Sequence, residues 1–116
     1  MTNKKGAKRK PTVAIRSGLL PYINLRRLRT VFKVKVYRRF CNFCQFAPNA
    51  DVVIIEDVGH PGASTVEGER IRAATRGTRA KTLVIGQWAN PAMKGDAYLR
   101  MPFGMSDLIA KIRSLL

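Results

Sequence analysis

The 116-residue chain is predicted to form one α/β domain, in which a doubly wound, five-stranded parallel sheet is covered by helices on both faces. The first observation behind this prediction is the alternation of short, all-apolar runs with helix-compatible segments, because strands buried on both faces read as continuous apolar runs. The second is size, since this length and 46% hydrophobic residues are ordinary for a single globular domain. In such a fold, a functional site is expected at the carboxyl ends of the strands.

Five short segments rich in β-branched or aromatic residues are predicted to be strands. They are residues 12–15, 32–37, 52–55, 82–85 and 98–101. The second alternates apolar and basic residues and places Lys33 and Lys35 on one side, which is typical of a half-exposed edge strand. The strands and the helices between them give the order βαβαβαβαβα, which predicts a three-layer sandwich.

The segments between and after these strands are predicted to be helical. They are residues 19–31, 39–47, 66–74, 90–97 and 106–116. Pro21 is compatible with the first helix because it lies in the first turn, and Ser106 is predicted to cap the last helix. Residues 1–10 contain five basic residues and almost no apolar ones, so they are expected to be a disordered basic arm before a folded domain of residues 11–116.

Charge is distributed unevenly along the chain. There are 22 basic and seven acidic residues, a net charge of +15, and thirteen of the basic residues precede the first acidic one, Asp51. This asymmetry favours an anionic partner such as nucleic acid or an acidic protein surface, although a basic surface can also serve solubility alone. The candidate anion-binding residues lie in the arm and around the first helix: Lys4, Lys5, Lys8, Arg9, Lys10, Arg26, Arg29, Lys33 and Lys35.

Several classes of site are disfavoured by the residues present. Cys41 and Cys44 form a CxxC, but His60 is the only histidine, so a complete zinc site is not available and both cysteines are expected to face the core. No Ser/His/Asp order or phosphate-cradling glycine motif is present, and we expect neither enzyme activity nor a metal or cofactor. The chain has no apolar run of about 20 residues and no secretory signal, which indicates a cytoplasmic protein without membrane association.

Two motifs resemble landmarks of the response-regulator receiver domain family (CheY-like). The stretch from Asp57 to Gly62, Asp-Val-Gly-His-Pro-Gly, is similar to the family's Asp-x-x-x-Pro-Gly, whose Asp accepts phosphate at the end of the third strand. The stretch from Tyr98 to Phe103 resembles the family's fifth strand and Lys-Pro-Phe turn. The segment from Glu67 to Arg72 fits the third helix, so the resemblance covers residues 12–116.

The same resemblance implies that most of the phosphorylation chemistry is lost. The family's two acidic metal ligands after the first strand fall at Arg16 and Ser17, its hydroxyl residue falls at Gly86, and its lysine falls at Met101. Asp57 remains as the acceptor, or Glu56 if the third strand is aligned without a gap. The chain is therefore interpreted as a pseudo-receiver, in which Arg16 is expected to lie close to Asp57 or Glu56.

The sequence leaves three functions open. The first is a phosphorylation-independent signalling module that binds a protein partner, or a second copy of itself, through the fourth-helix, fifth-strand and fifth-helix face. The candidate interface residues are Trp88, Tyr98, Arg100, Met101 and Phe103. The alternative is a nucleic-acid-associated protein that binds phosphates without sequence preference, because no base-reading motif is present. An active phospho-receiver is the least favoured.

Overall fold

The computed structural model describes residues 10–57, 66–87 and 95–116. Five parallel strands form one sheet in the order β2-β1-β3-β4-β5. The strands are β1 (Thr12–Arg16), β2 (Lys33–Tyr37), β3 (Val52–Asp57), β4 (Lys81–Gly86) and β5 (Ala97–Arg100). The predicted doubly wound, five-stranded α/β sandwich is confirmed, and the predicted edge strand is β2.

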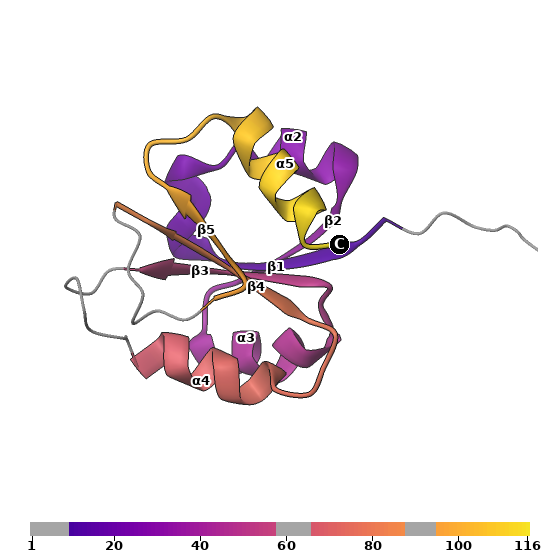
Figure 1. Ribbon diagram of the computed structural model, residues 1–116, viewed down its shortest axis with the longest axis vertical. Helices are drawn as coiled ribbons and strands as arrows, with labels where there is room; N and C mark the ends of the chain where they lie inside the picture. Colours follow the sequence, from indigo (N-terminus) through magenta and orange to yellow (C-terminus); the bar gives the residue numbers. More distant parts are fainter. Residues whose placement is uncertain (1–9, 58–65, 88–94) are drawn as a thin grey trace, which may run out of the picture.

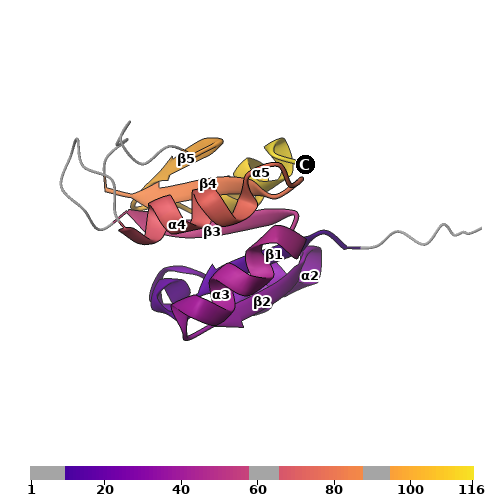
Figure 2. The same ribbon diagram turned by 90° about the horizontal axis from the view of Figure 1, so that it is seen from below.

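Helices cover both faces of this sheet. They are η1 (Ser17–Tyr22), α2 (Leu25–Val31), α3 (Phe40–Phe46), η2 (Ala47–Asn49), α4 (Val66–Thr75) and α5 (Met105–Ser114). Figure 1 shows α2 and α5 on one face and α3 and α4 on the other, and Figure 2, seen from below, shows α3 and α4 in front of the strands. Among the described residues, no helix is long and apolar enough to cross a membrane.

Each face of the sheet has its own hydrophobic core. Because successive side chains of a strand point to opposite faces, Ile54 packs with Leu28 and Leu108 in one core, whereas Val53 packs with Phe43 in the other. These five side chains are fully buried. Burying a side chain of this size contributes about 1.5–3 kcal/mol to stability. The two cores therefore stabilise the sheet from both faces.

The predicted helix at residues 19–31 is wrong in its first half. Residues 17–22 form the short 3₁₀ segment η1, Ile23 is extended, and the α-helix begins at Leu25. The Asn24 side chain accepts a hydrogen bond from the backbone N–H of Arg27 at 3.1 Å, which caps the helix there. Pro21 therefore lies in η1 rather than in the first turn of an α-helix.

Two other predicted boundaries need correction. Gly104, not Ser106, is the N-cap residue of α5, and its N–H donates to the Asp107 carboxylate at 3.3 Å. Ala97 begins β5 instead of ending a helix, while residues 90–94 of that predicted helix lie outside the described residues. Residues 1–9 of the predicted basic arm also lie outside them.

Candidate functional site

The carboxyl ends of β1, β3 and β4 lie next to one another, and they carry most of the predicted site residues. Arg16 ends β1, Glu56 and Asp57 end β3, and Gly86 ends β4. The strand register pairs Asp57 with Gly86, and the Asp57 residue is only 8% exposed. Ser17 begins η1 directly after Arg16 and is half-buried. Glycine at this position of β4 offers no hydroxyl beside the Asp57 carboxylate.

Arg16 makes contacts that its position in the sequence did not predict. Its Nη1 lies 3.0 Å from Oε2 of Glu67, in the first turn of α4, and its Nη2 donates to the Arg38 carbonyl oxygen at 3.3 Å. The guanidinium carbon also lies 5.3 Å from the centre of the Phe40 ring. The expected proximity of Arg16 to Glu56 is found, since both line one hollow, whereas the carboxylate that pairs with Arg16 is that of Glu67.

A small hollow of about 100 Å³ lies between these groups. It is lined in part by Arg16, Gly18, Phe40, Glu56 and Glu67. Burial raises the pKa of the Glu56 carboxyl above its ordinary value, and the negative charge of Glu67 raises it further. Glu56 thus lines this hollow together with Arg16, while Asp57 lies one residue further along, opposite Gly86.

The donor set of this hollow does not fit Mg²⁺, the cation that phosphoryl transfer to a carboxylate requires. Mg²⁺ takes several oxygen ligands in near-octahedral geometry. The described lining of the hollow supplies only two carboxylates, those of Glu56 and Glu67. The carboxylate of Glu67 is already paired with the positively charged guanidinium of Arg16. Among the described residues, no three His, Cys, Asp or Glu side chains cluster so that they could hold a metal ion.

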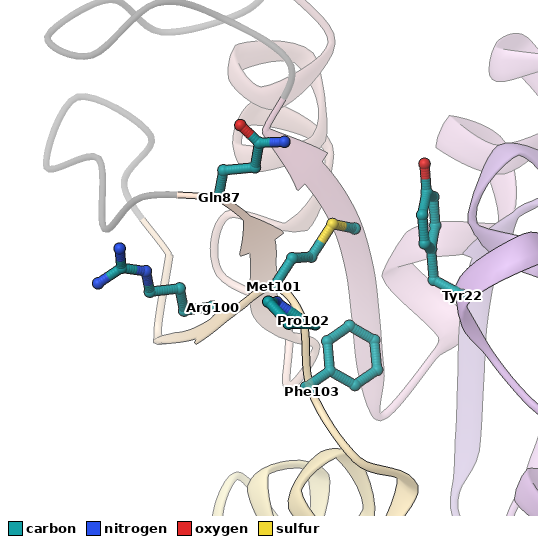
Figure 3. Close-up of a pocket in the computed structure, with 6 residues that line it drawn as sticks. All are labelled: Tyr22, Gln87, Arg100, Met101, Pro102 and Phe103. Carbon is teal, nitrogen blue, oxygen red and sulfur yellow. The ribbon is translucent and has the colours of Figure 1, made fainter.

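Met101 follows β5 at the same edge of the sheet, and its backbone N–H donates to the Gly86 carbonyl oxygen at 2.7 Å. An open pocket of about 500 Å³ surrounds it, and its lining residues are Tyr22, Gln87, Arg100, Met101, Pro102 and Phe103. In Figure 3 the Arg100 guanidinium points away from the rings of Tyr22 and Phe103. Position 101 therefore carries the thioether of Met101, packed against the apolar core, and no ammonium group.

The candidate interface residues are divided between the two faces of β5. Tyr98 packs against the core under α3 and α4, and its hydroxyl accepts a hydrogen bond from the Gly95 N–H at 3.1 Å. Met101 and Phe103 pack against the other core, whereas Arg100 is exposed. Trp88 lies outside the described residues. Tyr22, which is not among the interface residues predicted from the sequence, is 53% exposed beside Phe103 and Met101.

The predicted anion-binding residues lie in more than one place. Lys10, Arg29 and Lys33 line one open hollow of about 450 Å³, where the Lys10 Nζ donates to the Arg29 carbonyl oxygen at 3.1 Å. Lys35 lies apart, with its Nζ 6.0 Å from the centre of the Phe46 ring, and Arg26 is exposed on α2. Lys4, Lys5, Lys8 and Arg9 lie outside the described residues.

The two cysteines differ in exposure. Cys41 is exposed, so the expectation that both cysteines face the core is wrong for this residue. Cys44 is half-buried against Phe43, and burial raises the pKa of its thiol. His60 lies outside the described residues.

The protein is similar to known proteins in structure but not in sequence. The sequence matches no protein-family model and no curated protein. Solved receiver domains, however, share the structure over about nine-tenths of the chain.

Three such domains illustrate the similarity. The N-terminal domain of the nisin resistance regulator NsrR has a TM-score of 0.70 and 13% identity, covering 90% of this chain and 97% of its own. A CheY-like receiver domain of Methanospirillum hungatei JF-1 gives 0.68 and 15%, covering 92% and 93%. Chemotaxis protein CheY4 of Vibrio cholerae gives 0.65 and 16%, covering 94% and 100%. At these identities the similarity establishes the architecture, and the chain therefore has the fold of the CheY-like response-regulator receiver domains.

Proposed function

We propose that this protein is a pseudo-receiver, a signalling module that acts through protein contacts and without phosphorylation. The observation that carries the proposal is the ion pair between Arg16 and Glu67, at 3.0 Å, at the edge where a receiver would bind its cation. A guanidinium at this place repels a divalent cation and neutralises one of the two carboxylates that could attract it. Gly86 and Met101 add support, since neither can contact a transferred phosphoryl group with a hydroxyl or an ammonium.

The receiver TrrA of Thermotoga maritima has been solved as a complex with Mg²⁺ and BeF, and its fold is similar to this chain, with a TM-score of 0.63 and 17% identity. We propose that the present chain does not form such a complex. Mg²⁺ with beryllofluoride is therefore a direct binding probe. Isothermal titration of the protein with this mixture is expected to give no heat of binding.

The covalent test is incubation of the protein with a small-molecule phosphodonor and Mg²⁺, followed by intact-mass spectrometry. The expected result is an unmodified mass and an unchanged oligomeric state. A stoichiometric phosphoryl adduct on Asp57 or Glu56, lost in the matching Asp57→Asn or Glu56→Gln variant, would refute the proposal. The two variants also identify which carboxylate occupies the acceptor position.

The surface proposed for protein contacts, with a partner or with a second copy, is the region around β5 and the start of α5. Its support is the open pocket of about 500 Å³, where exposed Tyr22 and Arg100 flank the apolar Met101 and Phe103. Aromatic and arginine side chains around an apolar pocket are typical of protein-binding surfaces. Sedimentation over a range of concentrations, compared between the wild type and a Tyr22→Ala, Arg100→Ala variant, tests self-association at this surface.

A second candidate function is the binding of nucleic-acid phosphates. It is supported by the shared hollow of Lys10, Arg29 and Lys33, where three cations converge from the start of β1, the end of α2 and the start of β2. Such contacts are independent of sequence and weaken steeply with salt. Titration of a mixed-sequence DNA duplex at several salt concentrations tests whether the protein binds nucleic acid at all.

A further inference from the structure

The edge of the sheet opposite the Arg16–Glu67 pair is rich in cations. In a parallel sheet all strands start at one edge, and the helices that precede them end there. Figures 1 and 2 show that β1 begins and α4 and α5 end at this edge. The hollow of Lys10, Arg29 and Lys33 lies here, at the starts of β1 and β2. Another basic hollow lies on the same edge.

The second hollow lies at the other end of this edge, at the starts of β4 and β5. Its volume is about 370 Å³, and its lining includes Arg72, Arg76, Lys81 and Asp96. Gly77 positions these groups, because its φ of 77° lets the chain turn sharply after α4 ends at Thr75 and return into β4. Arg76 and Lys81 are exposed and Arg72 is half-buried, so all three cations are accessible from one side.

The acidic groups at this edge are already engaged. Asp51 accepts a hydrogen bond from the Thr12 N–H at 2.7 Å and pairs with Arg79 at 3.3 Å. Asp96 accepts from the Thr82 N–H at 2.7 Å. Both carboxylates therefore link neighbouring strands, and the cations of the two hollows remain in excess over them.

We propose that this edge, defined by Lys10, Arg29, Lys33, Arg72, Arg76 and Lys81, is a continuous binding surface for the phosphate backbone of a nucleic-acid duplex. The inference rests on the second proposed function and changes which residues bind the phosphates. The sequence assigned phosphate binding to the arm and the first-helix face, whereas the fold joins part of that set to three cations from α4 and β4.

The dimensions of the edge match a polyanion better than a single small anion. Five strands in the order β2-β1-β3-β4-β5 span roughly 19 Å at about 4.8 Å between neighbours. A B-form strand places a phosphate about every 3.4 Å along the helix axis, so this edge faces about six of them. Among the described residues, Leu116 is the large apolar side chain that is exposed at this edge. One such side chain provides little apolar area for insertion into a lipid membrane.

The test compares two variants with the same loss of charge. The first replaces the α4 and β4 cations (Arg72→Gln, Arg76→Gln, Lys81→Gln), and the matched control replaces exposed cations outside this edge (Arg38→Gln, Arg39→Gln, Arg70→Gln). Binding of a mixed-sequence DNA duplex of about 24 base pairs is followed by fluorescence anisotropy between ~50 and ~300 mM salt. Circular dichroism confirms that both variants are folded.

For the wild type, six phosphate contacts predict a slope of about −5 in log K against log salt. Removing three contacts should reduce the magnitude of this slope by about 2.7 and weaken binding about 100-fold near 0.15 M salt. The control variant should stay within a few-fold of the wild type. If the first variant does not fold, Lys10→Gln with Lys33→Gln tests the other hollow, with a slope change of about 1.8 expected.

One result would overturn the location, one would overturn the partner, and one would overturn both proposals. Equal binding by the wild type and the α4 and β4 variant, with loss in the control, places the phosphates elsewhere and leaves the second function standing. Tighter binding to phosphatidylserine vesicles than to the duplex excludes nucleic acid as the partner of this edge. A wild type that does not bind the duplex, even at low salt, refutes the second function and the edge together.

Discussion

Replacing Arg16 by Asp tests the ion pair between Arg16 and Glu67 at the carboxyl ends of the strands. The substitution removes the ion pair with Glu67 and a cation–π contact with Phe40 at 5.3 Å. The ion pair is partly exposed, with the side chain of Arg16 27% and that of Glu67 58% accessible. Each contact is worth up to about 1 kcal/mol at this exposure. A new carboxylate beside Glu56 and Glu67 adds repulsion. We therefore expect a loss of about 2 kcal/mol in the free energy of unfolding.

For a chain of this size, that loss lowers the midpoint of thermal unfolding by about 8 °C. The measurement is denaturant unfolding followed by circular dichroism, with Arg100→Asp as a control of equal charge change at an exposed position. The variant gathers three carboxylates at one place, so added Mg²⁺ should stabilise it. A concentration ten times the dissociation constant returns about 1.4 kcal/mol.

A double-mutant cycle with Glu67→Gln isolates the ion pair itself, because both partners are replaced separately and together. The reasoning fails if Arg16→Asp costs no more than Arg100→Asp. It also fails if Mg²⁺ stabilises the wild type as much as the variant, since the wild-type hollow would then hold the cation despite its guanidinium.

Three further predictions concern single side chains. Burial and the charge of Glu67 raise the folded-state pKa of Glu56 above its ordinary value of 4.5, so its ionised form destabilises the fold at neutral pH. Glu56→Gln should therefore be more stable than the wild type at pH 7, and unfolding measured from neutral to acidic pH should show this gain vanish below the ordinary carboxyl pKa. Phe43→Ala empties a fully buried position and should cost about 3–5 kcal/mol in urea unfolding, whereas a loss below 1 kcal/mol would mean that the core collapses around it. Asp51→Ala leaves the Thr12 N–H without its acceptor and should cost about 1–3 kcal/mol, and native-state hydrogen exchange should show faster opening at the start of β1.

The strands were predictable because few structures suit their composition. A run such as Val52 to Ile55 has no polar side, so only a sheet covered on both faces can bury it. The first helix was less predictable, because apolar spacing from Leu20 onward competes with a capping signal at Asn24. The side chain of Asn24 accepts a hydrogen bond from the N–H of Arg27, three residues further on, and this local bond sets the start of the helix at Leu25.

The site was predictable only where residues follow one another along a strand. Arg16 was expected directly after the first strand and is its last residue, but its partner Glu67 lies 51 residues further on. Sequence spacing carries no information about such a pair. The cations Arg72, Arg76 and Lys81 could have been found by a positional rule, because residues that end a helix and begin the next parallel strand meet at the same edge of the sheet.

The two outer strands of the sheet limit how copies of the protein can associate. β5 has only four residues, and β2 carries exposed Lys33 and Lys35 along its open side. Short edge strands and edge lysines discourage the backbone pairing by which sheets extend from one molecule to the next. Growth of the sheet from one copy to the next is therefore disfavoured at both outer strands, and an ordered assembly is expected to form through side-chain contacts, such as those around β5, rather than through backbone pairing.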